Sequence, residues 1–109
     1  MDSDYCMVVT TFSDKDVGKR IIDGLIKKRL AACVQTANIH SVYHWKGAVN
    51  NDAEVLVLIK TKTALYAEVE AFIREQHNYE VPEIIRVPIS GGFTGYLQWV
   101  DKECTGGGT

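Results

Sequence analysis

The chain has 109 residues, of which 46% are hydrophobic and 24% are charged, and this composition fits one globular domain with an ordinary core. Its net charge is −2 and its pI lies near 5.9, so it offers no basic field for a phosphate backbone. Nucleic acid is therefore not an expected partner.

The cysteines and the apolar runs indicate in which cellular compartment the protein works. Cys6, Cys33 and Cys104 are odd in number and have no C-x-x-C spacing, which argues against a disulfide framework and a zinc knuckle. The start of the chain is acidic, unlike a signal peptide, and no apolar run approaches the ~20 residues of a membrane span. A cytoplasmic protein without membrane partners is predicted.

The first elements are a strand and an amphipathic helix. Residues 5–11 are β-branched and aromatic, which predicts a strand. Ser13 is the predicted N-cap of the helix that follows. The apolar stripe of that helix contains Val17, Ile21, Ile22, Leu25 and Ile26. Gly18 and Gly24 within the helix indicate close packing.

A long hairpin comes next. Residues 32–45 and 49–59 are extended and are joined by the turn Lys46-Gly47. The polar run Asn50-Asn51-Asp52 predicts a bulge or a local loop in the second arm.

The remaining elements are a second helix, a fourth strand and a short last helix. Thr61 or Thr63 is expected to cap the second helix, residues 84–89 form the strand, and Thr94 is expected to cap the last helix. Residues 1–104 are predicted to be one domain, and residues 105–109 a disordered tail.

This order predicts an α+β, ferredoxin-like βαββαβ sandwich with a long hairpin between the second and third strands and an additional short C-terminal helix. Residues 55–59 are apolar on both faces of their strand, unlike a strand with one wet face. A second subunit is therefore expected to cover the face that the helices leave open.

Histidines are the first candidates for a site. His40 and His44 lie ~13 Å apart along one strand, too far to share one ion within a chain. His77 has Glu75, Glu80 and Glu83 near it in sequence, so it is either a ligand of a divalent ion or part of a polar surface.

A pocket or an interface is the second candidate. Tyr43 and Trp45 share one strand face and serve either packing or ligand binding. Lys60 is expected at the end of the third strand, either as a solvent-reaching lysine or near Glu83. Tyr79 and Glu83 flank the entry to the fourth strand, so a cleft between subunits could hold Lys60, Tyr79 and Glu83 against Tyr43 or Trp45. The alternative is an ion pair of Lys60 with Glu83 that locks the assembly. No catalytic motif such as a P-loop, G-x-S-x-G or H-E-x-x-H occurs, and no enzyme is expected.

Several segments resemble one family when they are taken in order. They are residues 30–34, 41–47, 54–55, 59–61, 77–85 and 96–99, which read LAACV, SVYHWKG, EV, IKT, HNYEVPEII and YLQW. The series is similar to the CutA family of divalent-cation-tolerance proteins along nearly the whole chain.

The resemblance implies a ferredoxin-like subunit, a homotrimer, a kinship of fold with PII signalling proteins, and a cytoplasmic role linked to copper and other divalent ions. It also implies a copper site made of one cysteine and two histidines. Thr10 stands at the position of that cysteine and Gln76 at that of the first histidine, and only His77 matches. Without the thiolate, copper or another divalent cation is expected to bind weakly, at His77. The competing function is a PII-like sensor that binds a small molecule between subunits.

Overall fold

A computed structural model of the chain describes residues 3–105, so most of the predicted disordered tail, residues 106–109, lies outside the described residues. The elements in chain order are β1 (Tyr5–Phe12), α1 (Lys15–Lys27), β2 (Cys33–Trp45), β3 (Ala48–Lys62), the 3₁₀ turn η1 (Thr63–Leu65), α2 (Tyr66–Gln76), β4 (Ile84–Pro88) and α3 (Thr94–Glu103).

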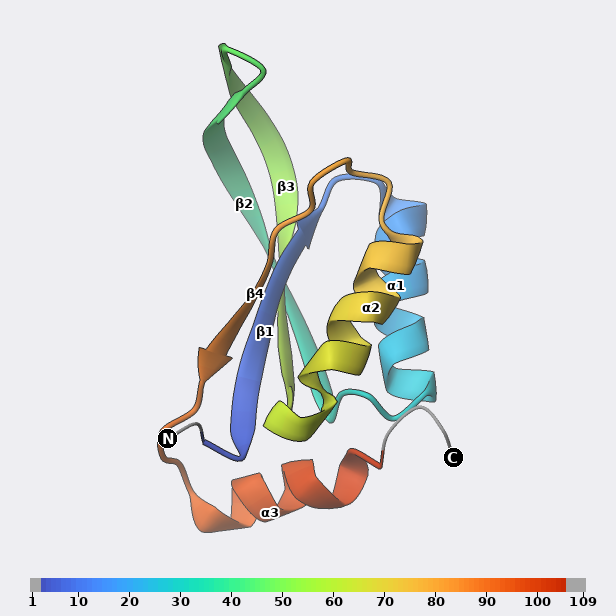
Figure 1. Cartoon of the computed structure of the whole chain (residues 1–109), viewed down its shortest axis with the longest axis vertical. Helices are drawn as coiled ribbons and strands as arrows, with labels where there is room; N and C mark the ends of the chain where they lie inside the picture. Colours follow the sequence, from blue (N-terminus) through green and yellow to red (C-terminus); the bar gives the residue numbers. More distant parts are fainter. Residues whose placement is uncertain (1–2, 106–109) are drawn as a thin grey trace.

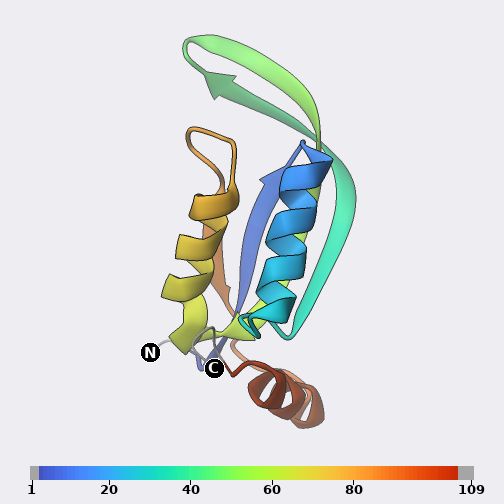
Figure 2. The same cartoon turned by 90° about the vertical axis from the view of Figure 1, so that its right-hand side faces the viewer.

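The four strands form one antiparallel sheet in the order β2-β3-β1-β4. Helices α1 and α2 lie side by side on one face of this sheet, and α3 crosses the end of the sheet where β1 begins (Figures 1 and 2). The predicted ferredoxin-like α+β fold with an extra C-terminal helix is confirmed.

Helix α1 begins and ends through local hydrogen bonds. Its N-cap is Asp14, not the predicted Ser13, because the Asp14 carboxylate accepts the N–H groups of Asp16 and Val17 at 2.8 and 3.2 Å. Beyond its C-cap, Arg29 takes a left-handed conformation with φ of 55°, and its N–H donates to the oxygen of Ile26 at 3.0 Å. The N–H of the next residue reaches back to Leu25, which completes a Schellman motif.

The hairpin is longer and more regular than predicted. Strands β2 and β3 pair without interruption from Cys33 opposite Lys60 to Trp45 opposite Ala48, so the bulge predicted at residues 50–52 is wrong. Lys46 and Gly47 turn the chain with φ values of 49° and 80°, as a two-residue type I′ turn requires. The tip extends beyond the helices and curves over the α2–β4 loop, residues 77–83 (Figure 2).

The predicted threonine caps of the later helices are wrong, because their hydroxyl groups have other partners or positions. Thr61 still belongs to β3, and its hydroxyl donates to the oxygen of Leu30 at 2.6 Å. The Thr63 hydroxyl donates to the oxygen of Ser3 at 2.6 Å. Thr94 is the first residue of α3, whose N-cap is Phe93.

The core lies between the sheet and the two helices α1 and α2. Its largest fully buried side chains include Val8, Ile21, Leu25, Val57, Ile59, Val69 and Ile73. The opposite face of the sheet, which we call the outer face, carries Met7, Val9, Leu56, Leu58, Ile85 and Val87, because paired residues of an antiparallel sheet share a face.

The outer face is only partly covered within the chain. Ile85 is 50% exposed and Val87 is 38% exposed, and helices α1 and α2 lie on the other face. The prediction of a second apolar face agrees with this arrangement.

Candidate functional site

The hairpin is tied to the body of the domain by hydrogen bonds between tyrosines and carboxylates. Tyr79 donates from Oη to Glu54 Oε2 at 2.7 Å, and Tyr43 donates to Asp52 Oδ2 across the hairpin. The Ser13 Oγ atom lies 2.9 Å from Tyr79 Oη, and it must donate there because Tyr79 gives its single proton to Glu54. We call these five residues the tyrosine–carboxylate cluster. It joins β2, β3, the β1–α1 connection and the α2–β4 loop.

Both phenols of the cluster hold their protons firmly. The hydrogen bond to Asp52 is the main reason that the pKa of Tyr43 is raised from its ordinary value of 10 to about 12. Burial is the main reason that the pKa of Tyr79 is raised, and the hydrogen bond to Glu54 adds to it. Near neutral pH both side chains are therefore hydrogen-bond donors and not nucleophiles.

His77 is the C-cap of α2 and connects two parts of the chain. Its Nε2 lies 2.7 Å from the main-chain oxygen of Thr11, and a carbonyl oxygen can only accept, so Nε2 carries a proton. Its Nδ1 accepts the N–H of Tyr79 at 3.1 Å, and the two rings lie 4.5 Å apart. A neutral imidazole has one donor and one acceptor, and the chain uses both.

The surroundings of His77 do not fit a metal ligand. The lone pair that a metal ion would need is bonded to Tyr79, and the other nitrogen faces a carbonyl oxygen. Thr10 is fully buried, and its hydroxyl has no hydrogen-bond partner among the residues that the structure describes. Within residues 3–105, no group of three or more His, Cys, Asp or Glu side chains could hold a metal ion. Weak copper binding at His77 stays a prediction, and the geometry weighs against it.

The structure separates two residues of the predicted cleft. Lys60 pairs with Met7, which in turn pairs with Val87. The Nζ of Lys60 contacts the side-chain oxygen of Gln35. Glu83 precedes β4 and lies about four residues, ~13 Å, up the sheet from Val87. The expected proximity of Lys60 to Glu83 is therefore not found within one chain.

The other predicted site residues are close to the loop or the tip. Tyr43 and Tyr79 both belong to the tyrosine–carboxylate cluster. Trp45 is 38% exposed beside the turn, where Lys46 Nζ stands 5.5 Å from the centre of its ring. Lys46 Nζ also lies 3.5 Å from a carboxylate oxygen of Glu80, which links the tip to the α2–β4 loop.

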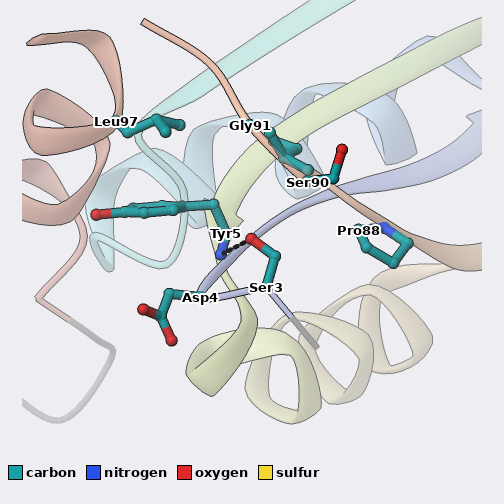
Figure 3. A pocket seen from close by; sticks show the side chains of 8 residues that line it. Ser3, Asp4, Tyr5, Pro88, Ser90, Gly91 and Leu97 are labelled. Atoms are coloured by element: carbon teal, nitrogen blue, oxygen red, sulfur yellow. Dashed lines mark hydrogen bonds between the residues drawn. The ribbon is translucent and has the colours of Figure 1, made fainter. Parts of the chain in front are cut away.

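Two depressions mark the surface of the described residues. One has a volume of about 590 Å³ between the start of β1, the end of β4 and α3, and Figure 3 shows Tyr5, Leu97 and Ser90 among its lining residues. The other, about 430 Å³, borders Arg74, Tyr79 and Pro82. Both are open. Asp4 is the charged residue that lines the first, and the second mixes Arg74 with Glu75 and Glu80, so neither defines a ligand by its charge.

Sequence reasoning missed Ser13, Asp52 and Glu54 as members of the cluster. The sequence predicts a bulge or local loop at Asp52 and a helix cap at Ser13, and Glu54 enters only as part of the two-residue segment 54–55 of the family resemblance. Their proximity depends on how the hairpin curves over the loop, which no local spacing specifies. The signal that was available is the strand alternation, which places Asp52 and Glu54 on one face of β3.

The fold, the hairpin and the cluster define a class of protein, the ferredoxin-like chains whose central hairpin projects past the helices. Known proteins narrow that class. The profile of the CutA1 divalent ion tolerance protein family matches residues 6–103, and the chain belongs to this family.

Solved structures and curated relatives agree with that assignment. CutA1 from the psychrotrophic bacterium Shewanella sp. SIB1 superposes with a TM-score of 0.91 and 37% identity, covering 96% of this chain and 99% of the other. The divalent-cation tolerance protein CutA of Thermus thermophilus is 38% identical over 92% of this chain and 97% of its own length. The human protein CutA is 44% identical over 83% of this chain.

The chain spans about half the length of its plant and mammalian relatives, for example 54% of the chloroplastic CutA 1 of rice and 51% of human CutA. The structure of the periplasmic divalent cation tolerance protein CutA from Archaeoglobus fulgidus aligns with this chain with a TM-score of 0.88 and 30% identity. In residues 3–105, every helix is too short or too polar to cross a membrane.

Proposed function

We propose that this chain acts in divalent-cation tolerance as a homotrimer, with a binding role and not a catalytic one. The observation that supports the trimer is the outer face of the sheet. Met7, Val9, Leu58, Ile85 and Val87 form an apolar surface there, and Ile85 is 50% exposed in the single chain. Burying such a surface against another copy is favourable at roughly 25 cal/mol per Å².

The two edges of the sheet support a ring. The edge strands are β2 and β4, which differ in sequence and length, so a contact in which β2 of one copy meets β4 of the next would join unlike strands. Unlike surfaces form head-to-tail contacts, which close into rings and not into two-fold dimers. The resemblance to the CutA family supports three as the number of subunits that we propose.

A mass measurement tests this proposal. Native mass spectrometry or light scattering should give three times the 12.2 kDa of one chain. Ile85→Glu should break the assembly, because it places a charge on the outer face. Ile26→Glu is the matched control: Ile26 is 45% exposed on α1, so the same change there should leave the mass intact. A monomeric protein at micromolar concentration contradicts the trimer.

A small-molecule sensor is the second candidate function. The tyrosine–carboxylate cluster favours it, because phenol and carboxylate groups gather where the hairpin meets the α2–β4 loop. A cleft between copies could add Lys60 or Glu83 of a neighbouring chain, which one chain does not bring together. A ligand of the native protein raises its melting temperature by mass action. Thermal-shift screening with small anions and nucleotides therefore tests it, and Tyr79→Phe should remove any shift found.

The proposal also includes weak copper binding and a cytoplasmic location. Weak binding of copper or another divalent cation would have to use His77, at the expense of its two hydrogen bonds. A cytoplasmic location is supported by the cysteines, which are all free, with Cys6 and Cys104 buried. Cell fractionation checks this, and recovery in a periplasmic or plastid fraction contradicts it.

A further inference from the structure

We infer that His77 is a positioning residue for the hairpin, acting through Tyr79, and that in this chain it is not a metal ligand. This inference does not depend on the trimer, because every contact that carries it lies within one chain.

The first step is the fixation of the loop. The imidazole of His77 donates from Nε2 to the Thr11 oxygen at 2.7 Å, which anchors the end of α2 to the end of β1. The same ring accepts the N–H of Tyr79 at 3.1 Å. One side chain thus sets the direction in which the α2–β4 loop leaves the helix.

The second step passes this fixation to the hairpin. The Tyr79 ring packs on His77, with 4.5 Å between ring centres and 48° between ring planes. Its hydroxyl reaches Glu54, which pairs with Ile39 where the hairpin begins to rise from the sheet. Glu54 is half-buried, and its carboxylate accepts the phenol proton at 2.7 Å. The hairpin is thereby anchored on the side that faces the loop.

The third step concerns the metal. A divalent ion would need the Nδ1 or Nε2 lone pair of His77, and taking either breaks one of the two bonds described above. The cysteine and the first histidine that the family resemblance calls for are Thr10 and Gln76 here, so no thiolate or second imidazole compensates. A divalent ion that bound at His77 would therefore break the contacts that hold the hairpin and would obtain only one protein ligand in return.

Two conservative variants separate the two bonds. In His77→Asn, the shorter side chain can still accept the N–H of the residue two positions on, as Asx turns do, but it cannot reach Thr11. In His77→Gln, the longer amide can donate to the Thr11 oxygen but lacks the rigid acceptor for Tyr79. His77→Ala removes both bonds, and Tyr79→Phe removes only the bond to Glu54. His44→Asn is the control for the loss of an exposed imidazole.

Hydrogen exchange of the full chain gives the readout. Amides of residues 39–54 should exchange about tenfold faster in His77→Ala, with smaller increases in the Asn and Gln variants, because one or two hydrogen bonds are lost. Amides of β1 between Cys6 and Val9 should change little. Tyr79→Phe should produce the same selective increase in exchange. The double variant with His77→Ala should exchange no faster than His77→Ala alone, because both changes break one chain of contacts. If His77 only stabilised the fold in general, the two effects would add.

Copper supplies the second readout. Nitrogen-15 spectra should show the Nε2-protonated tautomer of His77, and added Cu²⁺ should leave that ring unbroadened in the wild-type protein. Hairpin exchange that stays unchanged in every His77 variant overturns the inference. So does Cu²⁺ that broadens the His77 ring and raises the melting temperature of the wild-type protein but not of His77→Gln. Light scattering on each variant ensures that exchange is compared at one assembly state, and if His77→Ala fails to fold, the Asn, Gln and Tyr79→Phe variants carry the test.

Discussion

Gly18 of α1 lies directly against the ring of Phe12 at the end of β1, so close that a Cβ atom on Gly18 would stand 2.3 Å from Phe12 Cε2. Both residues are buried, so the ring cannot make room for a Cβ by turning out into solvent. We expect Gly18→Ala to lower the free energy of unfolding by about 1–3 kcal/mol through overpacking. Denaturant titration at fixed protein concentration measures it.

Gly24→Ala is the matched comparison in the same helix. A Cβ there would lie 2.2 Å from the Cζ of Phe72, but this ring is only partly buried and can turn toward solvent. Alanine also gains about 1 kcal/mol of helix propensity over glycine. A nearly unchanged stability is expected, and a loss as large as that of Gly18→Ala would contradict the role assigned to burial.

Thr10 hides a hydroxyl that the described residues leave unpaired. It is fully buried in β1, and Oγ1 has no hydrogen-bond partner there. Thr10→Val replaces the hydroxyl with a methyl group of similar shape and should raise the free energy of unfolding by about 1 kcal/mol. Thr10→Ser keeps the hydroxyl and loses the methyl, so it should be destabilising. Thermal melts of the two variants should move in opposite directions.

Arg29 occupies a left-handed position that suits glycine. Its φ is 55°, which costs a residue with a Cβ roughly 1–2 kcal/mol. Its ion pair with Glu103, at 2.9 Å, is solvent-exposed and is therefore worth little. Arg29→Gly should stabilise the chain by about 1 kcal/mol. Arg29→Ala loses the ion pair but keeps the strain, so it should be no more stable than wild type; a gain as large as that of glycine would show that the strain is absent.

The tyrosines of the cluster predict a response to alkaline pH. Because the pKa of Tyr43 is raised to about 12 in the folded chain, its hydrogen bond to Asp52 stabilises the hairpin fully below pH 10 and is lost as the pH rises toward 12. Absorbance at the tyrosinate band should show one phenol that titrates near pH 12. Asp52→Asn should lower that pKa, since Asp52 is its main cause, and Tyr43→Phe should remove the step. A step that survives in Tyr43→Phe belongs to another tyrosine.

Trp45 tests the reach of the hairpin. The ring is 38% exposed at the tip, and Lys46 covers it in part. If a neighbouring chain buries this ring, Trp45→Ala should weaken the trimer by about 3–5 kcal/mol while the isolated subunit keeps its fold. Dilution followed by light scattering measures the assembly, and circular dichroism follows the fold. An unchanged trimer with an unchanged melting temperature rules out Trp45 as an anchor.

The elements of the core were predictable because burial imposes a period on them. Val17, Ile21 and Leu25 recur at helical spacing, and the Lys46-Gly47 turn follows from the positive φ values that a tight hairpin needs. The hairpin beyond the core obeys no such constraint. Both its faces meet solvent in the single chain, so Asn50 and Asp52 sit in a regular strand without a hydrophobic alternation to reveal it.

The site was less predictable for a related reason. Tyr79 and Glu54 are 25 residues apart, and their contact depends on the curvature of a hairpin whose path is not set by burial. The sequence singles out His77 because a histidine next to carboxylates suggests a metal ligand and because it matches the family resemblance. Its actual partners are main-chain groups, Thr11 oxygen and Tyr79 N–H, which leave no mark in the side-chain sequence.

The buried cysteines allow local opening of the fold to be measured by thiol labelling. Cys104 closes α3 with its sulfur 3.8 Å from Thr61 Oγ1, fully buried, and burial raises the pKa of its thiol. Cys6 is equally buried in β1, whereas Cys33 is half-buried at the start of β2. A thiol reagent can reach Cys104 only when α3 lifts from the end of the sheet, so its labelling rate counts those openings, with Cys33 in the same molecule as the internal standard.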